Sequence, residues 1–236
     1  MQRPTGLRIV NGRVNAYLRQ GKKMKIACLH TAQSNVAVFD EAARSLDLPQ
    51  DALTHEVMPH LLEQAQAAGG VTPEIEKETI AALAQLRTDA DVVLLTCSTL
   101  GSAADFLGQD PGIMRVDRAL AQAASTAGKP VVVLCAAPTT LHPTAALFRA
   151  TLSPATPLAV EIIPEAWALF QSGQHDAFHQ RVAEAAQQAF ARGAGCVALA
   201  QASMAGAERY FSHPKLLTSP RAALAQIVAR LERDRA

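Results

Sequence analysis

The clearest strand of this chain lies in the stretch Asp91-Val92-Val93-Leu94-Leu95-Thr96-Cys97-Ser98-Thr99-Leu100-Gly101. Its four apolar residues run without polar alternation, which predicts a strand buried on both faces, as in a parallel sheet. A thiol, two hydroxyls and a glycine follow, and then comes the helix-like run 102–107. In open α/β sheets, ligands bind beyond the carboxyl ends of the strands. Cys97 is therefore expected at such an edge, where the amides of a following helix favour the reactive thiolate.

Composition and charge exclude several classes of protein. The chain has 236 residues, 49% of them hydrophobic, which suits one large or two small α/β domains with a sizeable core. Its formal net charge is +1, and both signs are scattered, so neither nucleic acid nor a membrane surface is expected as a partner. The longest apolar runs have the length of strands, far short of a membrane-spanning helix.

Cysteine usage and the first residues indicate where the protein resides. Cys28, Cys97, Cys135 and Cys196 show no CxxC spacing, so we expect a reducing, cytoplasmic setting rather than a disulfide framework. Residues 1–23 are basic and lack the apolar core of a signal peptide. We interpret them as an N-terminal extension or tag and exclude them from the fold.

Strands and helices alternate along the rest of the chain. Thr72-Pro73-Glu74 combines a capping residue, a proline at the first helical position and an acid in the first turn, which predicts the start of a helix. The alternation predicts a parallel α/β architecture. The predicted strands cover residues 25–29, 54–58, 92–96, 114–117, 131–136, 159–163 and 196–200, and the predicted helices cover 36–46, 73–90, 102–107, 118–127, 174–192 and 221–235.

A long internal repeat connects the two halves of the chain. The strand, loop and helix of Val92–Leu107 reappear at Cys196–Phe211, displaced by 104 residues, and Ile26–Leu29 matches Val131–Leu134 at a displacement of 105. Segments that match in nearly one register predict a duplicated unit. We therefore expect two pseudo-symmetric lobes, each with a short parallel sheet flanked by helices.

The repeat also predicts how the lobes are divided and what lies between them. We assign residues 24–117 and 208–236 to the first lobe and residues 118–207 to the second. Corresponding strand ends would face one another across a cleft, which is a favoured position for a small-molecule site. In this register Cys97 corresponds to Gln201.

Several short motifs, in this order and spacing, resemble the aspartate/glutamate and hydantoin racemase superfamily, which includes arylmalonate decarboxylases and maleate isomerases. The resemblance runs from about Lys25 to the end of the chain. It is carried by the segments Thr96–Thr99, Pro138–Thr140, Leu199–Met204 and Leu216–Pro220. It implies chemistry without a cofactor, at the carbon next to the carboxylate of a small substrate. In the racemases, one cysteine from each lobe flanks that carbon.

The resemblance also implies roles for particular residues. Cys97 matches the cysteine of the first lobe, and the hydroxyls matching positions that hold the substrate carboxylate are Ser98, Thr99, Thr139 and Thr140. Ser34 and Asn35 lie in the corresponding first loop, and Ser203 lies in the 199–204 segment. Hydroxyls and amides around the carboxylate would stabilise the enediolate that forms when the α-proton leaves.

The main departure from the family pattern is Gln201, which stands where racemases place the second cysteine. A glutamine amide forms hydrogen bonds but does not exchange protons near neutral pH. Cys196 lies five residues earlier, on the opposite face of its strand and roughly 16 Å away at about 3.3 Å per residue. Racemisation by two cysteines is therefore not expected.

Three readings of the chemistry stay open. The first is an enzyme of this family that uses Cys97 as its single acid/base or nucleophile, with His30, His142 and Glu208 as the titratable residues to examine as a second base. The second is a decarboxylase of a malonate-type acid, which needs one proton donor. The third is a catalytically inactive homologue that still binds a carboxylate.

Other kinds of site and partner are poorly supported. No glycine-rich phosphate loop follows a strand, so no nucleotide cofactor is expected. No metal site is expected either, because His55 and His60 lack a third ligand nearby and His175 and His179 are predicted on a solvated helix face. The oligomeric state stays open, and a homo-oligomer is compatible with the sequence.

Overall fold

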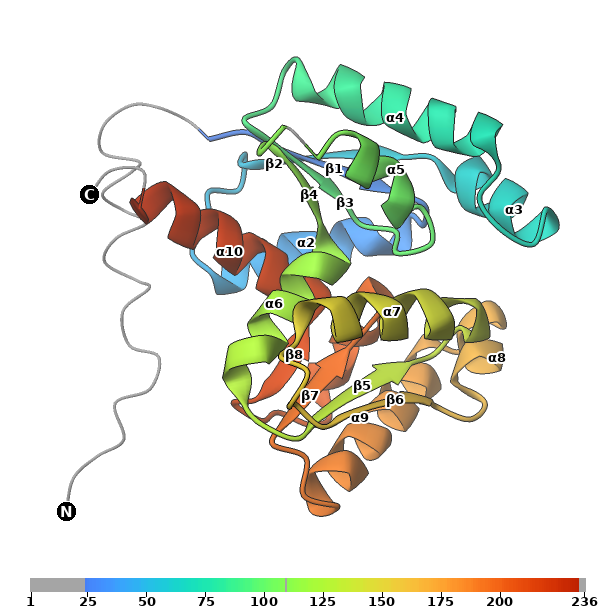
Figure 1. The fold of residues 1–236 in the computed structure, drawn as a ribbon, viewed down its shortest axis with the longest axis vertical. Helices are drawn as coiled ribbons and strands as arrows, with labels where there is room; N and C mark the ends of the chain where they lie inside the picture. Colours follow the sequence, from blue (N-terminus) through green and yellow to red (C-terminus); the bar gives the residue numbers. More distant parts are fainter. Residues whose placement is uncertain (1–23, 109, 234–236) are drawn as a thin grey trace.

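Two four-stranded parallel sheets form the framework of the protein (Figure 1). The computed structural model describes residues 24–108 and 110–233, so the extension or tag expected at residues 1–23 lies outside the described residues. The strand order is β2-β1-β3-β4 in the first sheet and β6-β5-β7-β8 in the second. The strands are β1 (Ile26–His30), β2 (Leu53–Val57), β3 (Val92–Leu95), β4 (Ile113–Arg115), β5 (Val131–Cys135), β6 (Leu158–Ile162), β7 (Cys196–Leu199) and β8 (Leu216–Thr218).

Helices cover both faces of each sheet, as expected where the inner strands are apolar throughout. They are α2 (Ser34–Ser45), α3 (Pro59–Ala67), α4 (Pro73–Arg87), α5 (Gly101–Phe106), α6 (Val116–Ala127), α7 (Leu141–Thr151), α8 (Ala166–Gln171), α9 (His175–Ala191) and α10 (Ser219–Arg233), with two 3-10 helices, η1 (Pro138–Thr140) and η2 (Ala202–Arg209). The α/β class predicted from the sequence is confirmed.

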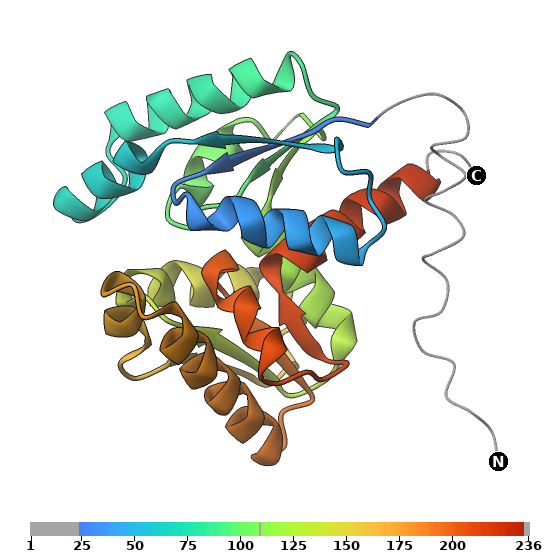
Figure 2. The same ribbon diagram turned by 180° about the vertical axis from the view of Figure 1, so that it is seen from behind.

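Alternate residues of each inner strand enter different cores. In β3, Val92 and Leu94 pack with α2 and α10, whereas Val93 and Leu95 pack with α3, α4 and α5. Figure 2 shows α2 and α10 on the side of the first sheet that faces the second lobe. The first sheet therefore has one layer of helices turned outward and one at the junction.

The two sheets repeat one another element by element. The strands β1 to β4 correspond in order and pairing to β5 to β8, at displacements of 103 to 105 residues. The internal repeat and the two lobes predicted from it are therefore confirmed. Thr72 also caps α4 as predicted, since its hydroxyl accepts a hydrogen bond from the backbone amide of Ile75 at 3.4 Å.

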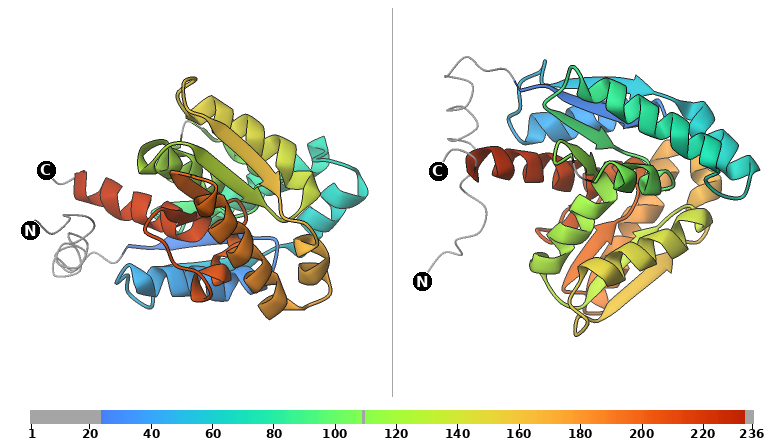
Figure 3. Two further views of the ribbon diagram at one scale, coloured as in Figure 1. Left: turned by 90° about the horizontal axis from the view of Figure 1, so that it is seen from below. Right: turned by 45° about the horizontal axis from the view of Figure 1, so that its top comes forward.

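The helix that follows the last strand of each sheet packs against the other sheet. α6 follows β4 of the first sheet but packs against the second, while α10 follows β8 of the second sheet and packs against the first. Figures 1 and 3 show the two helices meeting at the junction of the lobes. The boundary predicted at residue 208 differs from this arrangement, because β8 pairs with β7 and so belongs to the second sheet. The first-lobe boundary at 117 likewise falls inside α6.

Three helices were not expected from the sequence: α3, α7 and α8. Proline opens the first of these, and in α7 the pair His142-Pro143 lies in the first turn, a place where proline is tolerated because its missing amide would have no helical partner. His142 therefore lies on a helix and not in a loop. α3 and α8 have only 9 and 6 residues, which is too short for an apolar period to identify a helix, and the pair His142-Pro143 at the start of α7 is more often found in a loop.

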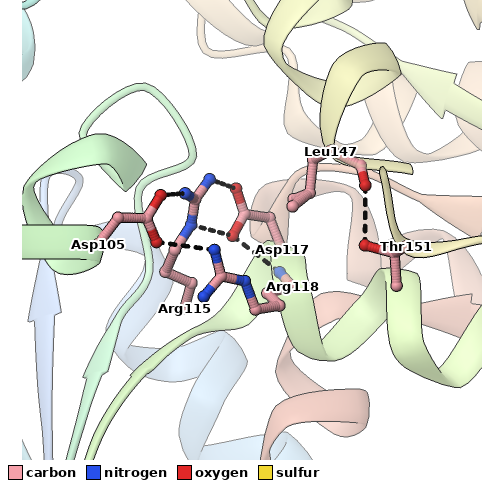
Figure 4. Close-up of polar contacts among 6 residues, drawn as sticks. All are labelled: Asp105, Arg115, Asp117, Arg118, Leu147 and Thr151. Carbon is pink, nitrogen blue, oxygen red and sulfur yellow. Dashed lines mark hydrogen bonds and ion pairs between the residues drawn. The ribbon is translucent and has the colours of Figure 1, made fainter. Parts of the chain in front are cut away.

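A largely buried arginine, Arg115, joins the end of β4 to the start of α6 (Figure 4). Arg115 forms a two-point ion pair with Asp117, at 3.0 and 2.8 Å, and a third contact with Asp105 of α5 at 2.6 Å. The side chains of Arg115 and Asp117 are only 11% and 10% exposed. Burial by itself lowers the pKa of Arg115, but the two carboxylates outweigh it and raise the pKa above its ordinary value. Gly101 lies directly against the guanidinium and leaves no room for a side chain.

Among residues 24–108 and 110–233, none of the helices combines the length and apolar character that crossing a membrane requires.

Candidate active site

A small pocket of about 80 Å³ lies where the carboxyl ends of the two sheets meet. Each of the four inner strands sends its following loop into it, which is the position that parallel sheets favour for ligands. The lining residues are Thr31, Ala32 and Asn35 after β1; Thr96, Cys97, Ser98 and Thr99 after β3; Ala137, Thr139 and Thr140 after β5; Ala200, Gln201, Ala202 and Ser203 after β7; Leu62 and Gln66 of α3; Trp167 and Phe170 of α8; and Val116.

The structure brings together eight of the nine residues singled out from the sequence. Cys97 and Gln201 line the pocket, together with Asn35, Ser98, Thr99, Thr139, Thr140 and Ser203. Ser34 does not, because it is exposed at the start of α2. One residue along a helix is a rotation of about 100°, so the buried Asn35 turns inward while Ser34 turns away.

Cys97 carries the one thiol among the lining residues of this pocket, and the others have apolar, hydroxyl or amide side chains. It is half-buried at the end of β3. The other three cysteines are fully buried in strands, and burial raises the pKa of each thiol: that of Cys196 to about 11, and those of Cys28 and Cys135 also upward. Cys196 faces the core beneath α6 and α7, so it does not replace the missing second cysteine.

Gln201 is held by the backbone of the neighbouring strand. Its side-chain oxygen Oε1 accepts hydrogen bonds from the amides of Ala136, at 2.6 Å, and Ala137, at 3.1 Å. These two residues are buried, so the glutamine satisfies two buried backbone donors. The bonds set the orientation of the carboxamide, because only the oxygen can accept. Gln201 thus ties the end of β7 to the end of β5.

This tie predicts a measurable contribution to stability. Replacing Gln201 with leucine would leave both buried amides without a partner and is expected to lower the free energy of unfolding by about 2–4 kcal/mol. A carboxylate can accept the same two hydrogen bonds, so Gln201→Glu is expected to lower the free energy of unfolding by less than Gln201→Leu does. Urea denaturation of both variants would measure the difference. Gln66→Leu is the matched control, since this glutamine also lines the pocket but is exposed.

The hydroxyls of the pocket fall into two groups. Thr140 is buried and donates its hydroxyl proton to the carbonyl of Ala137 at 2.7 Å, so it closes the turn after β5. For the side chains of Ser98, Thr99 and Thr139, no hydrogen bond joins them to another residue in the described ranges, and their hydroxyls can donate to a ligand. The lining also includes apolar side chains, among them the stacked rings of Trp167 and Phe170, whose centroids are 5.4 Å apart.

None of the three residues examined as a second base lines this pocket. His142 lies on α7, and Glu208 lies on η2 in a different hollow, where burial raises its carboxyl pKa. His30 lies behind the pocket, where Nδ1 is 2.9 Å from the hydroxyl oxygen of Thr96. Burial and the neighbouring His55 lower the pKa of His30 to about 4, against an opposing effect of Asp40.

Two histidines differ from their predicted surroundings. His179 was expected on a solvated face, but it is half-buried, its Nε2 donates to the carbonyl oxygen of Ser203 at 2.9 Å, and burial lowers its pKa. His55 was expected without ligands nearby, but its Nδ1 is 2.9 Å from Nε2 of His30. These contacts depend on which strands and helices become neighbours, which the local sequence does not specify.

Comparisons with known proteins agree with the fold. No family model matches the sequence, and no curated protein sequence matches it. Among solved structures, glutamate racemase from Bacillus anthracis aligns with a TM-score of 0.65 and 14% identity, covering 90% of this chain and 84% of that one.

Two further racemases align over similar lengths. Aspartate racemase from Picrophilus torridus has a TM-score of 0.63 and 13% identity, with 88% of this chain and 95% of that one covered. Allantoin racemase from Klebsiella pneumoniae has a TM-score of 0.61 and 17% identity, with coverages of 89% and 88%. At these identities the likeness concerns architecture. This chain therefore has the two-lobed α/β fold seen in these glutamate, aspartate and allantoin racemases.

Proposed function

We propose that the protein is a cofactor-independent enzyme that acts at the carbon next to a carboxylate and uses Cys97 as its single proton carrier. The observation that carries this proposal is the asymmetry of the pocket. One side holds a half-buried thiol, and the corresponding position on the other side holds Gln201, whose oxygen is occupied by two backbone amides. Proton transfer is therefore supported on one face of the substrate only.

The other lining residues support binding of the carboxylate. Ser98, Thr99 and Thr139 present hydroxyl donors, and Asn35 and Ser203 add further polar groups. When the α-proton leaves, negative charge moves onto the carboxylate oxygens, and donors already in place stabilise the resulting enediolate. The same thiol then returns a proton to the same face, so exchange with solvent would occur with retention of configuration.

A decarboxylase of a malonate-type acid is the second candidate, and the apolar residues of the lining favour it. A carboxylate placed against Leu62, Val116, Trp167 and Phe170 loses its hydration, which promotes its departure as CO₂. The bond from the α-carbon to that carboxyl breaks, and its electron pair enters an enediolate on the remaining carboxylate. The Cys97 thiol gives its proton to the α-carbon, and water reprotonates the thiolate.

One experiment tests these proposals together. The protein is incubated in deuterium oxide with candidate amino acids, hydroxy acids and 2-substituted malonates, and nuclear magnetic resonance follows the α-proton. We expect one solvent deuterium at the α-carbon and a single enantiomer, with CO₂ released if the substrate is a malonate. Racemisation as fast as exchange would contradict the single-carrier proposal. Tight binding without exchange or turnover would instead identify an inactive carboxylate-binding homologue.

A further inference from the structure

A second cluster of reactive side chains lies on the face of the first sheet that α2 and α10 cover. Cys28 and His30 are two residues apart in β1, so both point to this face. His55 of β2 is the strand neighbour of Cys28 and joins them. The possible ligand atoms of the three side chains all lie within 4.8 Å of one another. Cys28 and His30 are fully buried, and His55 is 15% exposed.

Hydrogen bonds on the outer side of each histidine ring define the positions of the ring protons. Nε2 of His55 is 3.2 Å from a carboxylate oxygen of Asp40, which can only accept, so this nitrogen carries a proton. Nδ1 of His30 faces the hydroxyl oxygen of Thr96 at 2.9 Å. That hydroxyl donates its own proton to the carbonyl of Leu29, so it accepts from His30.

When both rings are neutral, the two inner nitrogens are therefore both acceptors. Nε2 of His30 and Nδ1 of His55 face each other at 2.9 Å, each with a lone pair directed at the other. Two lone pairs at this distance repel unless a cation lies between or beside them. A thiol next to two imidazole nitrogens is a donor set suited to zinc rather than to magnesium or calcium, which prefer oxygen.

We propose that Cys28, His30 and His55 bind a zinc-type transition metal through Sγ, Nε2 and Nδ1. The outer contacts match those of known metal sites, in which a ligating histidine donates its other ring proton to a carboxylate or another oxygen. Here Asp40 accepts the hydrogen bond from His55, and the hydroxyl of Thr96 accepts that from His30. Zn–N bonds of about 2.0 Å and a Zn–S bond of about 2.3 Å place tetrahedral ligand atoms roughly 3.3 Å apart for the two nitrogens and roughly 3.5 Å apart for sulfur and nitrogen. The two nitrogens, now 2.9 Å apart, need to separate by a few tenths of an ångström, and Sγ, which lies within 4.8 Å of both, needs to approach by at most about 1.3 Å.

The position of the cluster indicates a structural role. A metal there would join β1 to β2 and, through the bond from His30 to Thr96, brace the strand end that carries Cys97. The partly exposed edge beside His55 and Asp40 gives the ion a route of entry. This inference does not depend on the proposed catalytic function, since its ligands lie outside the lining of the pocket.

Metal binding by the full-length chain tests the proposal. After dialysis against a chelator and then addition of zinc, we expect about one zinc per chain to remain through gel filtration and to raise the melting temperature. Cobalt in place of zinc is expected to give a thiolate-to-cobalt charge-transfer band. Cys28→Ala and His55→Gln should abolish stoichiometric binding, whereas His60→Gln should not, because His60 is exposed and bound to Glu78 at 2.8 Å.

Two results would overturn the proposal. One is stoichiometric zinc in the wild type that Cys28→Ala and His55→Gln leave unchanged, which would place the metal elsewhere. The other is a wild type that retains no zinc and shows no cobalt–thiolate band, in which case a shared proton joins the two rings. The cobalt spectrum of the wild type identifies the thiolate even if a variant does not fold.

Discussion

Cys97→Ser is expected to slow α-carbon exchange of the substrate found in the deuterium experiment by about 10³-fold, within the range of about 10²–10⁴ contributed by general acid–base groups. A serine hydroxyl fills nearly the same space but does not ionise near neutral pH. No other lining residue of the described chain can take over, because none of their side chains exchanges protons there. The rate of deuterium incorporation measures the loss, and calorimetry of ligand binding should change little.

The matched control is Cys196→Ala, which removes a thiol buried in the second lobe, away from the pocket. It should keep the exchange rate of the wild type. Exchange in Cys97→Ser within tenfold of the wild type would contradict the assignment of Cys97 and would require another proton carrier.

Arg115→Leu is expected to lower the free energy of unfolding by about 3–5 kcal/mol, which is the usual effect of removing one partner from a buried ion pair. The Asp117 carboxylate, which is 10% exposed, would lose both of its contacts with the guanidinium. It would still accept a hydrogen bond from the backbone amide of Arg118 at 2.8 Å. Because Asp117 lies in the first turn of α6, loss of this ion pair would destabilise the start of the helix that connects the first sheet to the second. Urea denaturation measures the effect.

Arg118→Leu provides the comparison, since Arg118 binds Asp105 at 2.7 Å but is 46% exposed. Exposed ion pairs contribute little, so this variant should lose less than about 1 kcal/mol. The double variant Arg115→Leu, Asp117→Leu should recover part of the stability, because no uncompensated charge remains buried. Equal losses in the two single arginine variants would contradict the importance assigned to burial.

Much of the fold could be predicted because its signals are local. Unbroken apolar runs such as 92–95 and 131–134 identify strands buried on both faces. The near-constant displacement of 104 residues identifies two equivalent sheets. The lobe boundary could not be read in this way, because α6 and α10 leave the sheet that precedes them and pack on the other one.

The residues of the candidate site likewise fall into those that local sequence predicts and those that it does not. Cys97, Ser98 and Thr99 follow a recognisable strand, and parallel topology places such residues at a ligand-binding edge. Leu62, Trp167 and Phe170 were missed because they lie on helices of only 9 and 6 residues, too short for a recognisable apolar period. The hydrogen bonds of Gln201 were also missed, since they depend on the backbone amides of Ala136 and Ala137, just after β5, which lie 65 and 64 residues away in the sequence.

The sequence by itself determined the parallel α/β class, the duplication and the strand end that carries Cys97, because each depends on short-range pattern or on similarity between segments. Only the tertiary structure decided what faces these residues. Cys28 and His30 share a face by the two-residue period of a strand, but His55 joins them only through the register of β1 with β2. The register of the strands and the packing of α6 and α10 on the opposite sheets depend on contacts between segments far apart in the sequence. A local stretch of sequence does not determine the energies of such contacts.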